Sequence, residues 1–83
     1  MKTTLNPADL HSSVIAVPPL CRDASRRVDA AENAKLIQHL ERGGVSTLLY
    51  GGNANFYNLA LSEYEAVLDV LEQAAGTESW IIP

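Results

Sequence analysis

The stretch VSTLLYGGNANFYNLAL, residues Val45–Leu61, is the part of the sequence around which the rest is organised. It begins with an apolar run typical of a buried strand, breaks at a glycine pair and a polar turn, and leads toward a helix. Glycine has no Cβ and tolerates positive φ, so Gly51 and Gly52 would let the backbone come close to a ligand. In α/β folds ligands bind just outside the carboxyl ends of the strands. We therefore expect any binding site to lie at this turn.

The composition is that of a small globular domain. The chain has 83 residues, 47% of them hydrophobic, and a formal net charge of −4. The only basic cluster, Arg22, Arg26 and Arg27, is too small for a nucleic-acid or anionic-membrane surface. No apolar run is long enough to span a membrane, and the start lacks the apolar core of a signal peptide. We expect a cytoplasmic protein without nucleic-acid or membrane partners.

Side chains that could bind a metal or act as nucleophiles are sparse. Cys21 is the single cysteine, which excludes a disulfide framework and a cysteine metal site. His11 and His39 have no partner at the spacing of a metal site or catalytic triad. The sequence therefore predicts no metal site and no nucleophile–base pair.

Three apolar runs predict strands, at Ser13–Val17, Val45–Tyr50 and Trp80–Ile82. The first is stopped by two prolines and the second by two glycines. Because these runs do not alternate between apolar and polar residues, they suit strands that are buried on both faces of a parallel sheet.

Two amphipathic helices are predicted between the strands. The first opens at Asp29, which has capping-box spacing with Glu32, and ends at Gly43-Gly44 in a left-handed cap. Its apolar stripe consists of Ala30, Ala31, Ala34, Leu36, Ile37 and Leu40.

The second helix is predicted from Ser62 to about Ala75, with Ser62 and Glu65 as its capping box. Gly76 is expected to cap its carboxyl end. The predicted apolar face consists of Tyr64, Val67, Leu68, Leu71 and Ala75.

The order strand, helix, strand, helix, strand predicts an α/β fold. The strand centres lie near Ala16, Leu48 and Ile81, spaced by roughly one βα unit of about 30 residues. Eight such units make a (β/α)₈ barrel, also called a TIM barrel, of about 250 residues. We therefore expect residues 1–83 to be the amino-terminal fragment of a single barrel domain, with its first two βα units and the start of the third strand.

The turn Gly51–Asn55 allows two interpretations. It is either a simple exit from the strand or a cradle for an anion, in which backbone amides and the side chains of Asn53 and Asn55 bind carboxylate oxygens. The turn matches neither the G-x-G-x-x-G fingerprint nor a P-loop, which argues against nucleotide phosphate binding. The aromatic residues beside it, Tyr50, Phe56 and Tyr57, are expected to pack in the core, with the alternative that a tyrosine hydroxyl at the strand end faces a substrate.

The sequence as a whole resembles the amino-terminal quarter of the dihydrodipicolinate synthase / N-acetylneuraminate lyase family. The resemblance covers nearly all of residues 13–83 and is most specific over Gly51–Tyr64. The matching pieces are Val17-Pro18-Pro19, Arg27-Val28-Asp29, Gly43-Gly44-Val45, Gly51–Leu59 and Leu61–Leu68.

This resemblance implies a lyase or aldolase that forms a Schiff base between a lysine and pyruvate or another 2-oxo acid, without a separate cofactor. Its substrate carboxylate would bind at Gly51, Gly52 and Asn53. The family's Schiff-base lysine lies on a later strand, so no catalytic residue is expected in this chain, and residues 1–83 alone would be inactive. Neither Lys2 nor Lys35 fits the role of a desolvated amine. Family members are commonly homotetramers, which implies the same assembly here.

The turn departs from the usual family sequence Gly-Thr-Thr-Gly-Glu. Gly52 and Asn53 stand where the two threonines would be, and Ala54 and Asn55 replace Gly-Glu. Gly52 has no hydroxyl, so the usual proton relay cannot pass through it. Two alternatives to an active lyase are therefore a catalytically altered or inactive barrel homologue that binds a keto or sugar acid, and a free-standing βαβαβ module with a structural role.

Overall fold

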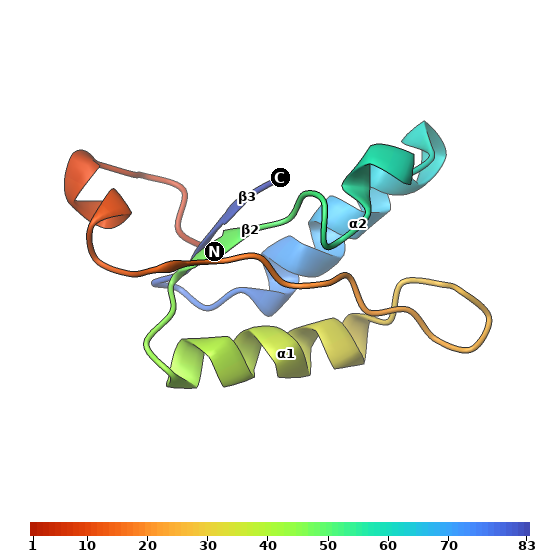
Figure 1. Cartoon of the computed structure of the whole chain (residues 1–83), viewed down its shortest axis with the longest axis horizontal. Coiled ribbons are helices and arrows are strands. Elements are labelled where there is room, and N and C mark those ends of the chain that lie inside the picture. The colour runs from red at the N-terminus through yellow and green to blue at the C-terminus, as the bar shows by residue number, and fades with distance from the viewer.

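Three short strands form one parallel sheet in the computed structural model, which describes residues 1–83 (Figure 1). Ala16, Leu48 and Ile81 are aligned across this sheet. The predicted α/β class is confirmed, with the strands parallel and adjacent in chain order: β1 (Ile15–Ala16), β2 (Thr47–Leu49) and β3 (Trp80–Ile82).

The first two strands are shorter than the predicted runs Ser13–Val17 and Val45–Tyr50. The amide of Val45 donates to the carbonyl of Leu40 at 3.1 Å, so Val45 belongs to the end of the preceding helix rather than to the sheet. β1 pairs with a neighbour on one side only, which leaves its flanking residues without ladder partners.

Two helices pack against each other, and both cover the same face of the sheet. They are α1 (Ala30–Arg42) and α2 (Leu61–Ala74). One buried cluster joins the helices to the central strand. Its most enclosed members, each at most 1% exposed, are Leu48, Tyr50, Ile37, Val67 and Leu71. This cluster fixes the positions of the loops that lead from the strands into the helices.

The start of α1 follows the prediction only in part. The Asp29 carboxylate accepts a hydrogen bond from the Glu32 amide at 3.0 Å, as expected for an N-cap. The reciprocal half of the capping box is wrong, because the Asp29 amide donates to the Cys21 carbonyl and the Glu32 carboxylate pairs with Lys35. The predicted left-handed end is confirmed at Gly44, which has φ of +90°.

The start of α2 differs from the prediction. The carbonyl of Ala60 accepts from the amides of Glu63 and Tyr64, so the helix begins at Leu61 and Ser62 already lies in its first turn. Ala60 has no polar side chain to cap the helix. The predicted capping box of Ser62 with Glu65 is therefore wrong.

The carboxylate of Glu41, near the end of α1, links this helix to the segment that precedes β3. It accepts hydrogen bonds from the Gly76 amide at 2.8 Å and from the hydroxyl of Ser79, a residue that is buried. A Cβ at Gly76 would lie 2.7 Å from this carboxylate. Gly76 lacks positive φ, so its predicted role as a left-handed helix cap is wrong; its small size instead admits Glu41.

The face of the sheet opposite the helices is only partly covered. Ile15, Thr47 and Trp80 are aligned across the sheet and alternate with the residues of the core. The segment that contains the 3₁₀ turn η1 (Pro7–Leu10) lies beside Trp80. Ile15 remains 50% exposed, so this apolar face is open near β1.

Candidate functional site

The turn after β2 lies at the carboxyl edge of the sheet, as predicted. It is closed by two backbone hydrogen bonds, from Asn55 to the carbonyl of Gly52 at 3.0 Å and from Phe56 to the carbonyl of Gly51 at 3.1 Å. The left-handed conformation that the sequence suggested for the glycines falls on Asn55 instead, with φ of 58°. Gly51 and Gly52 both lack positive φ, so the backbone conformation does not require glycine at either position.

Four consecutive backbone amides of this turn, those of residues 51–54, donate no hydrogen bond within the chain. A Cβ added at Gly51 or Gly52 would meet only Tyr57, at ordinary contact distances of 3.9 and 3.8 Å. The fold itself therefore does not require glycine at either position. Unpaired amides with open space above them are the chemistry with which backbone turns bind anions.

A cavity of about 370 Å³ adjoins the two glycines. Its lining contains no charged side chain; it consists of Leu49, Tyr50, Gly51, Gly52, Phe56, Tyr57, Tyr64 and Pro83. The residues that border this space therefore bring backbone groups and tyrosine side chains to it rather than charged groups. Such a lining suits a small acid whose charge is bound by amides and whose remaining atoms contact apolar side chains.

Asn53, the third residue predicted to bind substrate, does not line this cavity. Its side-chain amide donates to the carbonyl of Val17 at 2.9 Å, which joins the turn to the chain beyond β1. The structure thus places Gly51 and Gly52 at the cavity, whereas Asn53 lies outside it and attaches the turn to the chain after β1.

The aromatic residues near the turn have two different environments. Tyr50 and Phe56 are buried, as predicted, with ring centroids 5.9 Å apart, and Phe56 is also 5.9 Å from Tyr64. Tyr57 is 86% exposed, so the expectation that it packs in the core is wrong. It lies in the 3₁₀ turn η2 (Phe56–Asn58), which turns its side chain toward the glycines rather than into the core.

The Tyr50 hydroxyl is buried without a hydrogen-bond partner. Loss of hydration raises the pKa of this phenol above its ordinary range, and the nearby Cys21 thiol raises it further. Burial likewise raises the pKa of Cys21, with a contribution from Glu32 and Asp29. Both groups therefore stay neutral at pH 7, and neither is an activated nucleophile.

The two lysines lie away from the cavity. Lys2 forms an ion pair with Asp9 at 2.6 Å, and this hydrogen bond raises the pKa of Lys2. Lys35 is exposed and pairs with Glu32 at 3.0 Å. A Schiff-base lysine needs a lowered pKa and access to the substrate. Lys2 has a raised pKa, and Lys35 does not line the cavity.

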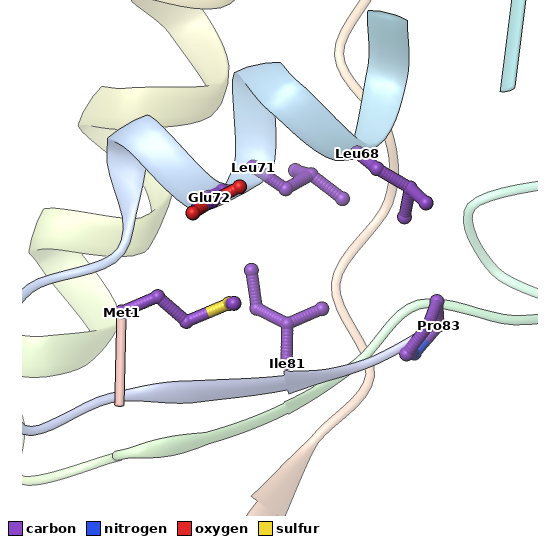
Figure 2. A pocket seen from close by; sticks show the side chains of 6 residues that line it. All are labelled: Met1, Leu68, Leu71, Glu72, Ile81 and Pro83. Atoms are coloured by element: carbon purple, nitrogen blue, oxygen red, sulfur yellow. The ribbon is translucent and has the colours of Figure 1, made fainter. Parts of the chain in front are cut away.

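A second cavity, of about 210 Å³, lies between α2 and β3 (Figure 2). Figure 2 shows the side chains of Met1, Leu71 and Ile81 turned toward one another across it. Glu72 is the single charged residue in the lining, at its rim with Met1. This cavity is a gap in the packing between helix and strand, without converging donors.

Sequence reasoning missed two residues that shape the site. Asn33 is fully buried on α1, and its amide binds both the amide and the carbonyl of Cys21, at 2.9 and 3.0 Å. Its position four residues before Ile37, on the apolar stripe, was the available signal. Tyr64 was predicted on the apolar face of the second helix but not as part of a cavity wall.

No protein-family model, curated protein or solved structure matches this chain. The resemblance to the dihydrodipicolinate synthase / N-acetylneuraminate lyase family stays a prediction. Neither helix has the combination of length and hydrophobicity that is needed to cross a bilayer.

Proposed function

We propose that this chain forms the first two βα units and the third strand of a (β/α)₈ barrel that acts as a Schiff-base lyase or aldolase on 2-oxo acids. The parallel sheet in chain order, with both helices on one face, is the arrangement that such a barrel repeats. The apolar face opposite the helices, open at Ile15, corresponds in this proposal to the packed interior of the barrel.

One observation carries the binding part of this proposal: Gly51 and Gly52, whose amides are free, border a cavity without charged side chains at the carboxyl edge of the sheet. A carboxylate bound there would accept hydrogen bonds from the turn, each worth roughly 1.5–3 kcal/mol when the acceptor is charged. The apolar cavity wall would contact the rest of a pyruvate-like molecule. The amine nucleophile would be a lysine outside residues 1–83, since Lys2 and Lys35 are engaged elsewhere.

The alternative is a barrel homologue that binds a keto or sugar acid without catalysing the lyase reaction. Gly52 has no hydroxyl to relay a proton, which favours this alternative. Both candidates predict the same carboxylate site, and only the first predicts that the whole barrel, with its Schiff-base lysine, forms a covalent pyruvate adduct on reduction with borohydride. The homotetrameric assembly and cytoplasmic location remain parts of the proposal that rest on the family resemblance and the composition.

The test is a titration of the ¹⁵N-labelled chain with pyruvate, followed by NMR. We expect the amide resonances of Gly51 and Gly52 to shift saturably. The change Gly52→Val should weaken binding about tenfold or more, because its side chain fills the space above the amides. Ala24→Val, in the exposed loop before α1, is the matched control and should bind as the unaltered chain does. Shifts that are absent, or equal at Gly43 and Gly51, would return the turn to a simple exit from the strand.

A further inference from the structure

We infer that the side-chain donor of the carboxylate site is the hydroxyl of Tyr57, and that Asn53 is a positioning residue that does not touch the ligand. This inference rests on the proposed carboxylate site at Gly51 and Gly52. It reverses the expectation from the sequence, in which Asn53 was the side chain assigned to the substrate.

The position of Tyr57 relative to the glycine pair supports its assignment as a ligand. Its hydroxyl lies 3.9 Å from the point where a Cβ of Gly51 would be, and its ring edge lies 3.8 Å from the same point at Gly52. The phenol therefore spans the part of the turn whose amides are free, and it lines the same cavity. Its hydroxyl makes no hydrogen bond within the chain. A neutral phenol is a good donor to a carboxylate.

The exposure of Tyr57 points the same way. A side chain that is 86% exposed contributes little to the core, whereas Phe56, its neighbour, is buried. The backbone that places Tyr57 is nevertheless well defined by hydrogen bonds. The Asn58 side chain donates to that of Asn55, and the Asn58 amide donates to the Asn55 carbonyl at 3.1 Å. The 3₁₀ turn thus holds an exposed aromatic ring over two glycines.

Asn53 is committed to a different contact. Its amide nitrogen donates to the carbonyl of Val17, 36 residues earlier in the chain, at 2.9 Å. Val17 directly follows β1 and precedes Pro18, which has no backbone N–H to donate. The hydrogen bond between this segment and the turn uses the Val17 carbonyl as its acceptor. The contact holds the turn against β1 and so fixes the direction of the free amides at Gly51 and Gly52.

Two variants separate the roles in the pyruvate titration. Tyr57→Phe keeps the ring and removes only the hydroxyl, and we expect it to weaken pyruvate binding about tenfold while the free chain keeps its amide spectrum. Ser62→Ala, which removes an exposed hydroxyl outside the cavity, is the control and should leave the affinity unchanged. Methyl pyruvate, which lacks the carboxylate, should respond little to Tyr57→Phe.

Two NMR signals distinguish an Asn53 that contacts the ligand from an Asn53 that only supports the turn. In the unaltered chain, pyruvate should leave the side-chain NH₂ resonances of Asn53 in place. Asn53→Ala should shift the Val17 carbonyl-carbon resonance before any acid is added, and weaken binding through the displaced turn. Unchanged affinity in Tyr57→Phe, or a saturable shift of the Asn53 NH₂ group, overturns this inference while the proposed function stands. Absence of pyruvate binding to the unaltered chain overturns both.

Discussion

The two loops that lead from a strand into a helix treat their backbone polar groups differently. In the loop before α1, both the amide and the carbonyl of Cys21 are hydrogen-bonded to the buried side chain of Asn33, which comes from α1. The Asp23 carboxylate accepts from the amides of Ser25 and Arg27. This loop is thereby fixed by one of its own side chains, that of Asp23, and by one from α1, that of Asn33. Its left-handed residue is Arg26, with φ of 65°.

In the loop before α2, the backbone amides of residues 51–54 have no partner, and an exposed tyrosine lies beside them. Both loops emerge from the same edge of the same sheet, so their surroundings are comparable. The first loop thus uses its polar groups for structure, whereas the second leaves four consecutive backbone amides unpaired, which under the proposed function are available to a ligand. Substitutions in the first loop should therefore alter stability, and substitutions in the second should alter binding.

The largest effect on stability is expected for Asn33→Ala. This change leaves the buried backbone groups of Cys21 without partners, and we expect the free energy of unfolding to fall by about 3 kcal/mol. Urea denaturation followed by circular dichroism measures it. Gln38→Ala, an exposed change on the same helix, is the control. If Asn33→Ala lowers the free energy of unfolding no more than Gln38→Ala does, the first loop is not fixed by Asn33 and the contrast between the two loops fails.

A smaller effect of opposite sign is expected for Tyr50→Phe. The Tyr50 hydroxyl is buried without a partner, so its removal should raise the free energy of unfolding by about 1 kcal/mol. Because the folded pKa of Tyr50 is raised, the unaltered chain keeps its full stability below the ordinary tyrosine pKa of about 10 and loses stability as the pH rises above it. Denaturation curves at pH 8 and pH 11 should show this loss reduced in the variant. Destabilisation by Tyr50→Phe would indicate that the hydroxyl has a partner.

The smallest effect is expected for the ion pair between Arg22 and Glu63, which links the first loop to α2 at 2.7 Å. Both side chains are more than a third exposed, so Arg22→Gln should change stability far less than Asn33→Ala. The hydrogen bond from Arg22 lowers the pKa of Glu63, so the contribution is present above the ordinary pKa of a glutamate and is lost as the pH falls through the lowered value. In thermal melts, the difference between variant and parent should be smaller at pH 3 than at pH 7. An equal difference at both pH values would assign the effect to packing.

Local patterns in the sequence predict much of this fold. The three apolar runs locate the strands. The Asp29 cap and the pair Gly43-Gly44 define the ends of α1, because both signals act over a few residues. The prediction of buried residues is less good where a residue type fits both the buried and the exposed face of a helix. Ala30 and Ala31 lie at helical spacing but are exposed, because a small side chain fits either face.

The site is less predictable because its decisive contacts join distant residues. Gly51 and Gly52 are identified by their place after a strand. The hydrogen bond from Asn53 to Val17 spans 36 residues and leaves no local pattern. The same holds for Asn33, whose partner Cys21 is 12 residues away. The orientation of Tyr57 depends on the 3₁₀ turn, which the sequence did not reveal.

The Glu41 carboxylate has a consequence for the order in which the chain folds. Its partner Gly76 is 35 residues away, so the contact forms only after the segment that contains β2 and α2 has closed into a loop. We expect an interaction of this kind to strengthen the finished structure and to contribute little to the transition state. Loss of the Glu41 carboxylate is therefore expected to shorten the lifetime of the folded state by speeding unfolding, while the folding rate stays nearly constant. We therefore expect the Glu41 side chain to slow the opening of the amino edge of the sheet.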